Sequence, residues 1–322
     1  MTTLSSEQAA LTALLERNHD GAAAWDALAR DGWLDLVPDR SSWALASVAA
    51  TVAGTAGVYH PQLAVGAHLA ATAVLPAAAP RARRMGVVTD LAGDGESMTG
   101  TAWGAEADAY VGWLPDQRVV SINRTDIEQT ASPMLFLEDA SVCRIAVAGS
   151  SINIVEGADP PECARAQVAF ILAAEATAVA TAATSRTGEY LAQRFAFGRP
   201  LAGQQVLQHR VVDMRLACLT GSALLERAAT EWTDGARPRS SWAAKLHAGQ
   251  QSVWTIEQAI QLHGGIGFTE ELGIASWLRI AQRCRLLMGG QTQAAREVLE
   301  SVSPAITPQP RDWALDFDPG MG

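Results

Sequence analysis

The chain has 322 residues, of which 48% are hydrophobic and 18% are charged. This is enough apolar material for a sizeable core, in one large domain or in two to three small ones. The 34 acidic and 24 basic residues give a net charge of −10, which argues against a general nucleic-acid or membrane-surface binder. Lys245 is the only lysine, so nearly all the positive charge lies on arginine.

The four cysteines are scattered without a Cys-x-x-Cys pair, which indicates neither a disulfide framework nor a zinc site. The six histidines form no ligand cluster, so we expect no metal. The chain does not open on a basic stretch followed by an apolar core, and no uninterrupted apolar run approaches the roughly 20 residues of a membrane span. The sequence therefore predicts a soluble, cytoplasmic protein.

Residues 5–80 have a helical pattern, in which leucines follow a capping serine at helical spacing. We therefore predict an N-terminal helical domain over residues 1–82. Its four helices are expected to begin near Ser5, to run from Ala22 to Leu36, to begin after Ser42, and to lie near Leu63–Leu75.

After Pro76 the pattern changes to short runs rich in β-branched or aromatic residues, separated by turn signals such as Ala92–Gly95 and Pro115-Asp116. These runs predict a small middle β-domain over residues 83–157. The expected strands are Met85–Leu91, Ser97–Trp103, Asp108–Leu114, Arg118–Asn123 and Val142–Val147.

Helical periodicity returns after Pro161, with apolar residues three and four apart. It predicts a C-terminal four-helix-bundle domain over residues 158–302 and an irregular tail over residues 303–322. The expected helices are 161–195, 203–233, 239–263 and 275–301.

Two motifs on these helices are the most informative features of the chain. Gln261–Phe268 reads Gln-Leu-His-Gly-Gly-Ile-Gly-Phe, and its glycines let the main chain adopt φ > 0 and approach a ligand closely. Arg194–Pro200 reads Arg-Phe-Ala-Phe-Gly-Arg-Pro, and its first arginine offers a planar charged fork that suits a pyrophosphate. The alternative interpretation of the glycines is a helix C-cap without a ligand.

In this order and on two long helices, the motifs resemble those of the acyl-CoA dehydrogenases, which are FAD enzymes. The resemblance covers roughly residues 20–300. It implies a mostly α fold with a small β-domain, in an α–β–α architecture that ends in a C-terminal four-helix bundle. It also implies that the chain clamps the ADP half of FAD from a neighbouring subunit. The positions matching the family's FAD contacts are Arg194, Phe197, Gln205, Gln261, Gly264 and Gly265.

The family's catalytic base has no counterpart at either of its two usual positions. In the family, a glutamate removes the α-proton while the β-hydride passes to flavin N5. The matching positions are Gln250, eleven residues before Gln261, and Gly289, in the turn that follows. A neutral amide cannot accept a proton near pH 7, so the catalytic residue stays unassigned. Glu257 and Glu271 flank the motif, as alternative bases or as ordinary solvated residues.

The β-domain also departs from the family pattern. No Thr-Glu-Pro segment is present, and Gly100–Gly104 only partly matches the Trp-x-Thr segment that contacts the isoalloxazine ring in the family. Trp103 and Trp113 are candidates for stacking on a flavin or an acyl chain, or are core residues. Leu69–Arg84 is shorter than its family counterpart. Such chains resemble the small subunits of heteromeric acyl-CoA dehydrogenases that act on bulky, including steroid-derived, acyl-CoAs, so we expect a flavin pocket that is incomplete within one subunit.

The resemblance therefore implies a subunit of a flavin-dependent acyl-CoA dehydrogenase, an oxidoreductase that desaturates the α,β bond of an acyl-CoA in fatty acid or steroid degradation. A homologous larger subunit would supply the glutamate in a heterotetramer, or the chain would form a homo-oligomer. An electron-accepting flavoprotein is a further expected partner. Two alternatives stay open, namely a non-catalytic scaffold subunit and a flavin monooxygenase or specialised biosynthetic flavoenzyme of the same fold.

Overall fold

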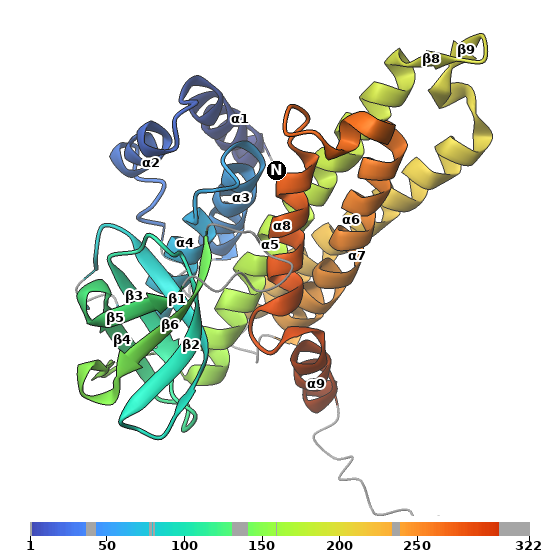
Figure 1. Cartoon of the computed structure of the whole chain (residues 1–322). Helices are drawn as coiled ribbons and strands as arrows, with labels where there is room; N and C mark the ends of the chain where they lie inside the picture. Colours follow the sequence, from blue (N-terminus) through green and yellow to red (C-terminus); the bar gives the residue numbers. More distant parts are fainter. Residues whose placement is uncertain are drawn as a thin grey trace, which may run out of the picture.

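The computed structural model describes residues 2–36, 43–76, 79, 81–130, 141–158, 160–233 and 239–302. Helices come first in the chain, a curled sheet follows, and further helices, of which α5 (Pro161–Gln193) is the longest, complete it (Figure 1). This order confirms the predicted mostly α fold with a small sheet in an α–β–α arrangement.

The first four helices agree in number and order with the four that the sequence predicts, but the second ends at Arg30 instead of Leu36. They are α1 (Thr2–Arg17), α2 (Gly21–Arg30), α3 (Trp43–Tyr59) and α4 (Val65–Val74). Asp20 is the N-cap of α2, and its carboxylate accepts a hydrogen bond from the main-chain N–H of Ala23 and so satisfies one of the free donors of the first turn. Every residue of α4 is buried, which makes this helix part of the core.

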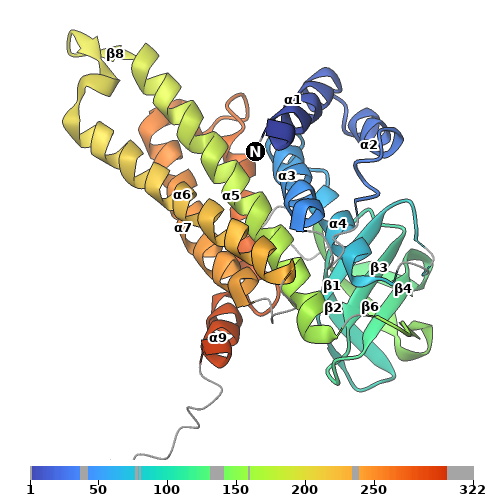
Figure 2. The same ribbon diagram turned by 180° about the vertical axis from the view of Figure 1, so that it is seen from behind.

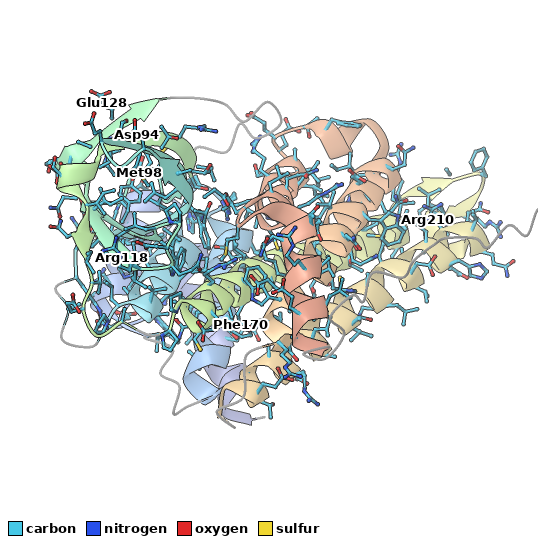
Figure 3. All side chains as sticks on the ribbon, turned by 90° about the horizontal axis from the view of Figure 1, so that it is seen from below. Asp94, Met98, Arg118, Glu128, Phe170 and Arg210 are labelled. Atoms are coloured by element: carbon cyan, nitrogen blue, oxygen red, sulfur yellow. The ribbon has the colours of Figure 1, made fainter. Side chains whose placement is uncertain are left out.

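The sheet contains the five predicted strands and two that the sequence analysis missed, β5 and β7. Its strands are β1 (Met85–Gly93), β2 (Ser97–Trp103), β3 (Ala109–Trp113), β4 (Val119–Asn123), β5 (Ile127–Thr130), β6 (Val142–Ala148) and β7 (Asn153–Ile154). They are ordered β5-β6-β2-β1-β3-β4-β7, and β1 and β3 are parallel whereas the other neighbours are antiparallel. The sheet curls around its own apolar side chains, among them the buried Met98 (Figure 3). Two short 3₁₀ turns, η1 (Arg124–Asp126) and η2 (Gly149–Ser151), join its strands.

Helix α5 (Pro161–Gln193) is the central helix of the molecule. It contacts α3 and α4 on one side and α6 (Gln205–Thr233), α7 (Arg239–His263) and α8 (Ile274–Leu286) on the other (Figures 1 and 2). The length of α5 and the mean hydropathy of 1.5 in its most apolar window would suit a membrane span, whereas the sequence analysis expected none. However, 78% of that window is buried inside the protein. A core helix has the same signature, so this is weak evidence for a span.

The prediction of a single fourth helix of the bundle, over residues 275–301, is wrong. The structure divides it into α8 and α9 (Gly290–Val302). Met288, Gly289 and Gly290 have φ values of 59°, 73° and 66°. Left-handed backbone cannot continue an α-helix, and two adjacent glycines adopt it at little cost. The turn that separates α8 from α9 therefore contains Gly289, one of the two family base positions.

A short hairpin joins α5 to α6 at the end farthest from the sheet (Figures 1 and 2). It consists of β8 (Phe195–Ala196) and β9 (Arg199–Pro200), followed by the 3₁₀ turn η3 (Leu201–Gly203). Phe197 and Gly198 at its tip have φ values of 54° and 75°. The paired ends of α5 and α6, which include Arg210 (Figure 3), form an arm that projects away from the sheet.

His68 on α4 connects the N-terminal helices to the sheet. Its Nδ1 accepts a hydrogen bond of 3.1 Å from the main-chain N–H of Met85, and its ring meets Trp25 edge-on with centroids 5.4 Å apart. Burial disfavours the charged imidazolium and lowers the pKa of His68 from 6.5 to about 4.

We therefore expect stability to fall as the pH drops from about 6.5 to about 4, because the unfolded chain takes up this proton first. The loss should approach about 3 kcal/mol near pH 4. Urea unfolding at several pH values across this range compares the wild type with His68→Asn, whose amide oxygen replaces the acceptor for Met85. An equal loss of stability in both proteins would exclude His68 as the cause.

Candidate functional site

The two sequence motifs lie on neighbouring helix ends. Arg194 is the C-cap of α5, and Gly264 begins the 3₁₀ turn η4 (Gly264–Phe268) that follows α7. Tyr190, one turn before Arg194, stacks on His263 with ring centroids 4.5 Å apart. His263 is buried, and its Nδ1 lies 2.7 Å from the carbonyl oxygen of Ala259. Its burial and this contact favour a structural role for His263.

The predicted FAD contacts are open to solvent at this end of the bundle. The side chains of Arg194, Gln205 and Gln261 are exposed, and Phe197 is 92% exposed. Gly264 has a φ of 66°, and no heavy atom lies within 4 Å of the place where its Cβ, or that of Gly265, would stand. The main chain at η4 is therefore free to approach a flat or charged ligand, as the glycines predict.

An exposed apolar surface, called the arm patch, surrounds these positions. Its members are large side chains that are at least 42% exposed: Phe195, Phe197, Val206, Val212, Leu216, Leu219, Ile266 and Phe268. Val212, Leu216 and Leu219 are four and three residues apart, so they share one face of α6. Large apolar side chains exposed on neighbouring elements favour an interaction site at this end of the bundle.

The two family base positions lie near each other, with an amide side chain beside them. Gln250 is exposed on α7, and Gly249 directly before it is covered by Gln291, since a Cβ on Gly249 would lie 1.9 Å from Nε2 of Gln291. Both amide atoms of Gln291 are buried and have no hydrogen-bond partner among the described residues. Gly289 precedes Gln291 by two residues. Sequence reasoning missed Gln291, whose importance depends on the turn between α8 and α9.

A cavity of about 310 Å³ opens beside Gly289, between the sheet and the turn. Asp90 stands on its wall in a left-handed conformation (φ 57°) and accepts a hydrogen bond of 3.1 Å from the Thr89 hydroxyl. Arg165 lines the same cavity and pairs with Glu297 at 2.9 Å. The sequence analysis did not single out Asp90, because only the fold brings β1 to this turn.

The alternative bases and Trp113 can also be placed. Glu257 on α7 and Glu271 after η4 are exposed, and neither lines the cavity beside Gly289. Trp113 does line it and is 8% exposed, whereas Trp103 does not. Among the described residues that line this cavity, Asp90 is the acidic side chain.

A buried ion pair lies where β2, α5 and α8 meet. Nη2 of Arg283 is 2.7 Å from Oε2 of Glu175, and both side chains are 1% exposed. The other terminal nitrogen of Arg283 donates to the hydroxyl of Ser141. The guanidinium also lies over the indole of Trp103, 5.4 Å from the ring centroid. Sequence reasoning missed this cluster, since Glu175 and Arg283 lie on different helices and belong to no motif.

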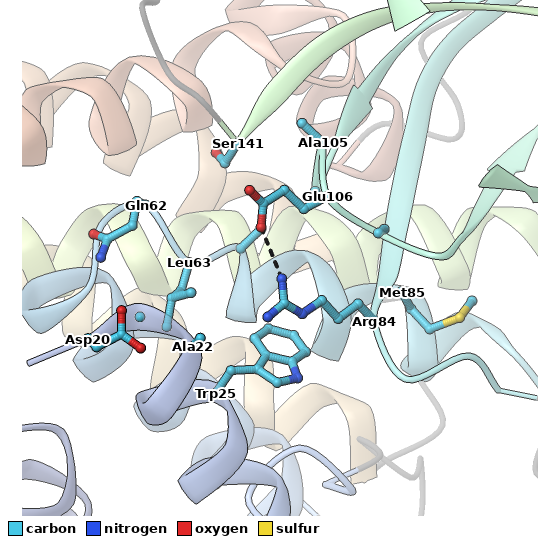
Figure 4. A pocket seen from close by; sticks show the side chains of 14 residues that line it. Asp20, Ala22, Trp25, Gln62, Leu63, Arg84, Met85, Ala105, Glu106 and Ser141 are labelled. Atoms are coloured by element: carbon cyan, nitrogen blue, oxygen red, sulfur yellow. Dashed lines mark hydrogen bonds and ion pairs between the residues drawn. The ribbon is translucent and has the colours of Figure 1, made fainter. Parts of the chain in front are cut away.

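A second cavity, of about 330 Å³, lies between α2, the segment that precedes α4, and the sheet (Figure 4). Arg84 lies over the Trp25 ring, 4.9 Å from its centroid, and pairs with Glu106 at 3.0 Å. Asp20 and Gln62 stand on the opposite side (Figure 4). Apart from Gly104, its lining contains no residue of the sequence motifs, so this cavity does not belong to the predicted cofactor site.

The family profile described as "Acyl-CoA dehydrogenase, C-terminal domain" matches residues 166–302, which include both motifs. The probable acyl-CoA dehydrogenase YngJ of Bacillus subtilis is 34% identical over 114 residues, 34% of this chain and 30% of that protein. The acyl-CoA dehydrogenase IpdE2 of Mycobacterium tuberculosis is 30% identical over 142 residues, 44% of this chain and 42% of that protein. The matched segments thus cover less than half the length of these curated relatives.

Solved structures extend the likeness to the whole fold. The ChsE4–ChsE5 complex from Mycobacterium tuberculosis superposes with a TM-score of 0.75 at 16% identity, covering 94% of this chain and 97% of that one. A variant of the Tcur3481–Tcur3483 steroid acyl-CoA dehydrogenase gives a TM-score of 0.69 at 16% identity, with coverages of 94% and 99%. At such identities the likeness establishes the fold alone. The profile match and the curated relatives thus assign residues 166–302 to the C-terminal domain of the acyl-CoA dehydrogenase family, and the chain as a whole has the fold of that family.

Proposed function

We propose that the chain is a subunit of an FAD-dependent acyl-CoA dehydrogenase that desaturates the α,β bond of an acyl-CoA thioester. The observation that carries this proposal is the open glycine turn η4 beside Arg194, within the segment that matches the family's C-terminal domain. Fatty acyl and steroid-derived thioesters are the proposed substrate classes. One solved structure with the same fold is described as a steroid acyl-CoA dehydrogenase, which supports the second of these classes.

Arg194, Phe197, Gln205, Gln261, Gly264 and Gly265 would hold the ADP half of FAD, which supplies the hydride acceptor of the reaction when bound. All six are open to solvent, as residues that reach a cofactor on a neighbouring subunit must be. The guanidinium of Arg194 would pair with the pyrophosphate, and the bare main chain at η4 would approach the nucleotide closely.

A partner subunit would supply the catalytic glutamate, because neither Gln250 nor Gly289 can accept a proton near pH 7. The fold is shared with the ChsE4–ChsE5 complex, which is consistent with a heteromeric assembly. It is also shared with a structure described as an electron transferring flavoprotein of Acidaminococcus fermentans, which is consistent with a flavoprotein as electron acceptor. The domain boundaries after residues 82, 157 and 302 and a cytoplasmic location are part of the same proposal.

Arg194→Ala should weaken FAD retention in the assembled protein by about tenfold or more, since a charge-assisted hydrogen bond contributes about 1.5–3 kcal/mol. Flavin stoichiometry and affinity, measured by absorbance after gel filtration and by titration, check this result. Arg118→Ala is the matched control, because Arg118 is exposed on the sheet, away from the arm (Figure 3). Unchanged flavin retention in Arg194→Ala would remove the cofactor assignment.

We expect the arm patch to be buried in an oligomer, formed either with a second copy of the chain or with the partner subunit. Leu216→Glu/Leu219→Glu places two charges on this surface and should shift the protein to a monomer in sedimentation at micromolar concentration. Leu299→Glu is the control, because Leu299 is 69% exposed on α9, outside the patch. A wild-type protein that sediments as a monomer alone and with its partner would contradict this prediction.

A non-catalytic scaffold subunit is the second candidate, favoured by the absence of a glutamate at the two family base positions. The candidates differ in the assembled complex. A flavin site that depends on Arg194 of this chain supports the dehydrogenase subunit. A complex whose flavin content and turnover are unaffected by Arg194→Ala and by changes in η4 supports the scaffold.

A further inference from the structure

Lys245, the only lysine of the chain, is fully enclosed in the protein. Its side chain on α7 is 0% exposed, and its Nζ has no hydrogen-bond partner among the described residues. A lysine is almost never fully buried unless it is paired, because its ammonium group loses its hydration. Within the part of the chain that the structure describes, this buried amine therefore lacks the group that would balance it.

Titratable groups approach Lys245 from two other elements. Cys284 on α8 places its Sγ 3.9 Å from the main-chain oxygen of Lys245, and Asp90 on β1 acts on the amine electrostatically. Burial raises the pKa of Cys284 to about 11, so its thiol is neutral near pH 7. The pair of Glu175 and Arg283, which also acts on Cys284, has no net charge. Burial lowers the pKa of Lys245 from 10.5, and Cys284 and Asp90 offset only part of this effect.

A second buried polar group lies on the same face of α7. Gly249 is one helical turn after Lys245, and residues four apart share a helix face. A Cβ on Gly249 would lie 1.9 Å from Nε2 of Gln291. Both amide atoms of Gln291 are buried without a hydrogen-bond partner among the described residues. Because each such group is unfavourable, two on one face indicate a place for a polar ligand between α7 and the turn from α8 to α9.

The cavity of about 310 Å³ beside Gly289 brings a ligand to this place. Its wall contains Met288 and Gly289, the residues of the turn that leads into Gln291, and also Asp90, which acts on Lys245. Trp113 lines the same cavity, and its buried Nε1 is another donor without a partner among the described residues. The volume has room for several heavy atoms.

The chemistry of these groups selects the class of ligand. The amine of Lys245, the amide nitrogen of Gln291 and the indole nitrogen of Trp113 are donors, so the ligand should be rich in acceptors. One ammonium group balances one negative charge. A carboxylate carries one charge on two acceptor oxygens, whereas a phosphate monoester carries about 1.5–2 negative charges at pH 7. The site therefore suits a carboxylate better than a phosphate.

We propose that Lys245 and Gln291 bind the carboxylate group of a ligand that enters the cavity beside Gly289, and that Lys245 takes up one proton with it. The carboxylate belongs either to a free acid or to the far end of an acyl group, since the two offer the same chemistry. The inference goes beyond the proposed function, because this site requires neither flavin nor thioester.

The single lysine makes the protonation state of the site directly observable. Full-length protein grown on ¹³Cε-labelled lysine gives one lysine side-chain NMR signal, and a pH titration of that signal measures the pKa of the amine, which should lie below 10.5. At about one pH unit above the measured value, most of the amine is neutral. Butyrate should then move the signal to the ammonium position. Butyramide, which has the same shape without the charge, should leave it unchanged at equal ionic strength.

Titration calorimetry in two buffers of different ionisation enthalpy measures the proton uptake, which should approach one proton for each butyrate at this pH. Lys245→Met should weaken butyrate binding by about tenfold or more, and Gln291→Leu by about two- to tenfold, because a charge-assisted hydrogen bond contributes more than a neutral one. Methionine fills a similar space without a polar atom to bury, so Lys245→Met should fold. Circular dichroism melting of each variant verifies this.

Two thioesters of equal length distinguish the sources of the carboxylate. One has an acyl group that ends in a carboxylate, and the other ends in a methyl group. A response to the first alone assigns the site to the far end of an acyl group, whereas a response to butyrate but to neither thioester assigns it to a free acid. Either result supports the carboxylate site.

An amine that titrates at or above 10.5 in the free chain would overturn the inference, because Lys245 would then already be paired with a carboxylate of the chain itself. An unchanged signal up to about 100 mM butyrate would also overturn it. So would an equal response to butyramide, or equal butyrate affinity in Lys245→Met. The proposed function is decided separately, through flavin retention in Arg194→Ala.

Discussion

Glu175→Leu should lower the free energy of unfolding by about 3–5 kcal/mol, because it leaves the guanidinium of Arg283 buried without its counter-ion. Glu175 is the acidic partner of Arg283 at 2.7 Å, and both side chains are almost fully enclosed by α4, α5, α8 and β2. Ser141 and the indole of Trp103 are further contacts of Arg283 among the described residues, and neither carries a negative charge. Leucine keeps most of the volume, so the loss measures the charge rather than a cavity.

Urea unfolding followed by circular dichroism measures this loss through the midpoint and slope of the transition. The double variant Glu175→Leu/Arg283→Met is the matched control, because it removes both charges and fills the space with apolar groups. Replacing both members of a buried pair is often neutral, so the double variant should regain most of the stability that the single variant loses. A single variant as stable as the wild type would mean that Arg283 has another compensating partner or access to water.

Sequence reasoning predicted the fold well where local patterns determine the structure. Helical periodicity located α1 to α7, and turn residues bounded five strands correctly. The motif glycines predicted an accessible main chain, and Gly264 and Gly265 have that property. The break between α8 and α9 was not predicted, although Gly289 and Gly290 were visible, because apolar periodicity continues on both sides of them.

The interior of the candidate site could not be predicted from the sequence. Glu175 and Arg283 are 108 residues apart, and neither lies in a motif. Gln291 and Asp90 matter only because a turn and a bulged strand bring them beside the base positions. Such contacts depend on how α4, α8 and the sheet pack together, and local sequence signals carry no information about that packing. The expected incomplete flavin pocket therefore stays a proposal.

The isolated chain, supplied with FAD, should desaturate an acyl-CoA thioester roughly 10²–10⁴-fold more slowly than a dehydrogenase with its glutamate, because general-base catalysis contributes about that factor. Reduction of an artificial electron acceptor, with a panel of fatty acyl and steroid-derived thioesters, measures the rate. Addition of a partner subunit that carries glutamate at the position of Gln250 should restore it. Flavin content is measured in parallel, so that a missing cofactor is not mistaken for a missing base.

Restoring the carboxylate within this chain distinguishes a missing base from a missing flavin-ring site as the cause of inactivity. Gln250→Glu is the suitable variant, because Gln250 is exposed and tolerates a charge. Gly289→Glu is unsuitable, since Gly289 has a φ of 73° and a Cβ there would lie 2.7 Å from Cβ of Gln293. We expect Gln250→Glu alone to remain slow, because Trp103, the aromatic residue expected at the ring, is fully buried. A marked gain in rate would mean that the chain does hold a flavin ring. An ordinary dehydrogenase rate in the unmodified homo-oligomer would have a larger consequence. It would mean that another residue acts as the base and that catalysis needs no partner subunit. Asp90 would then be the first residue to test.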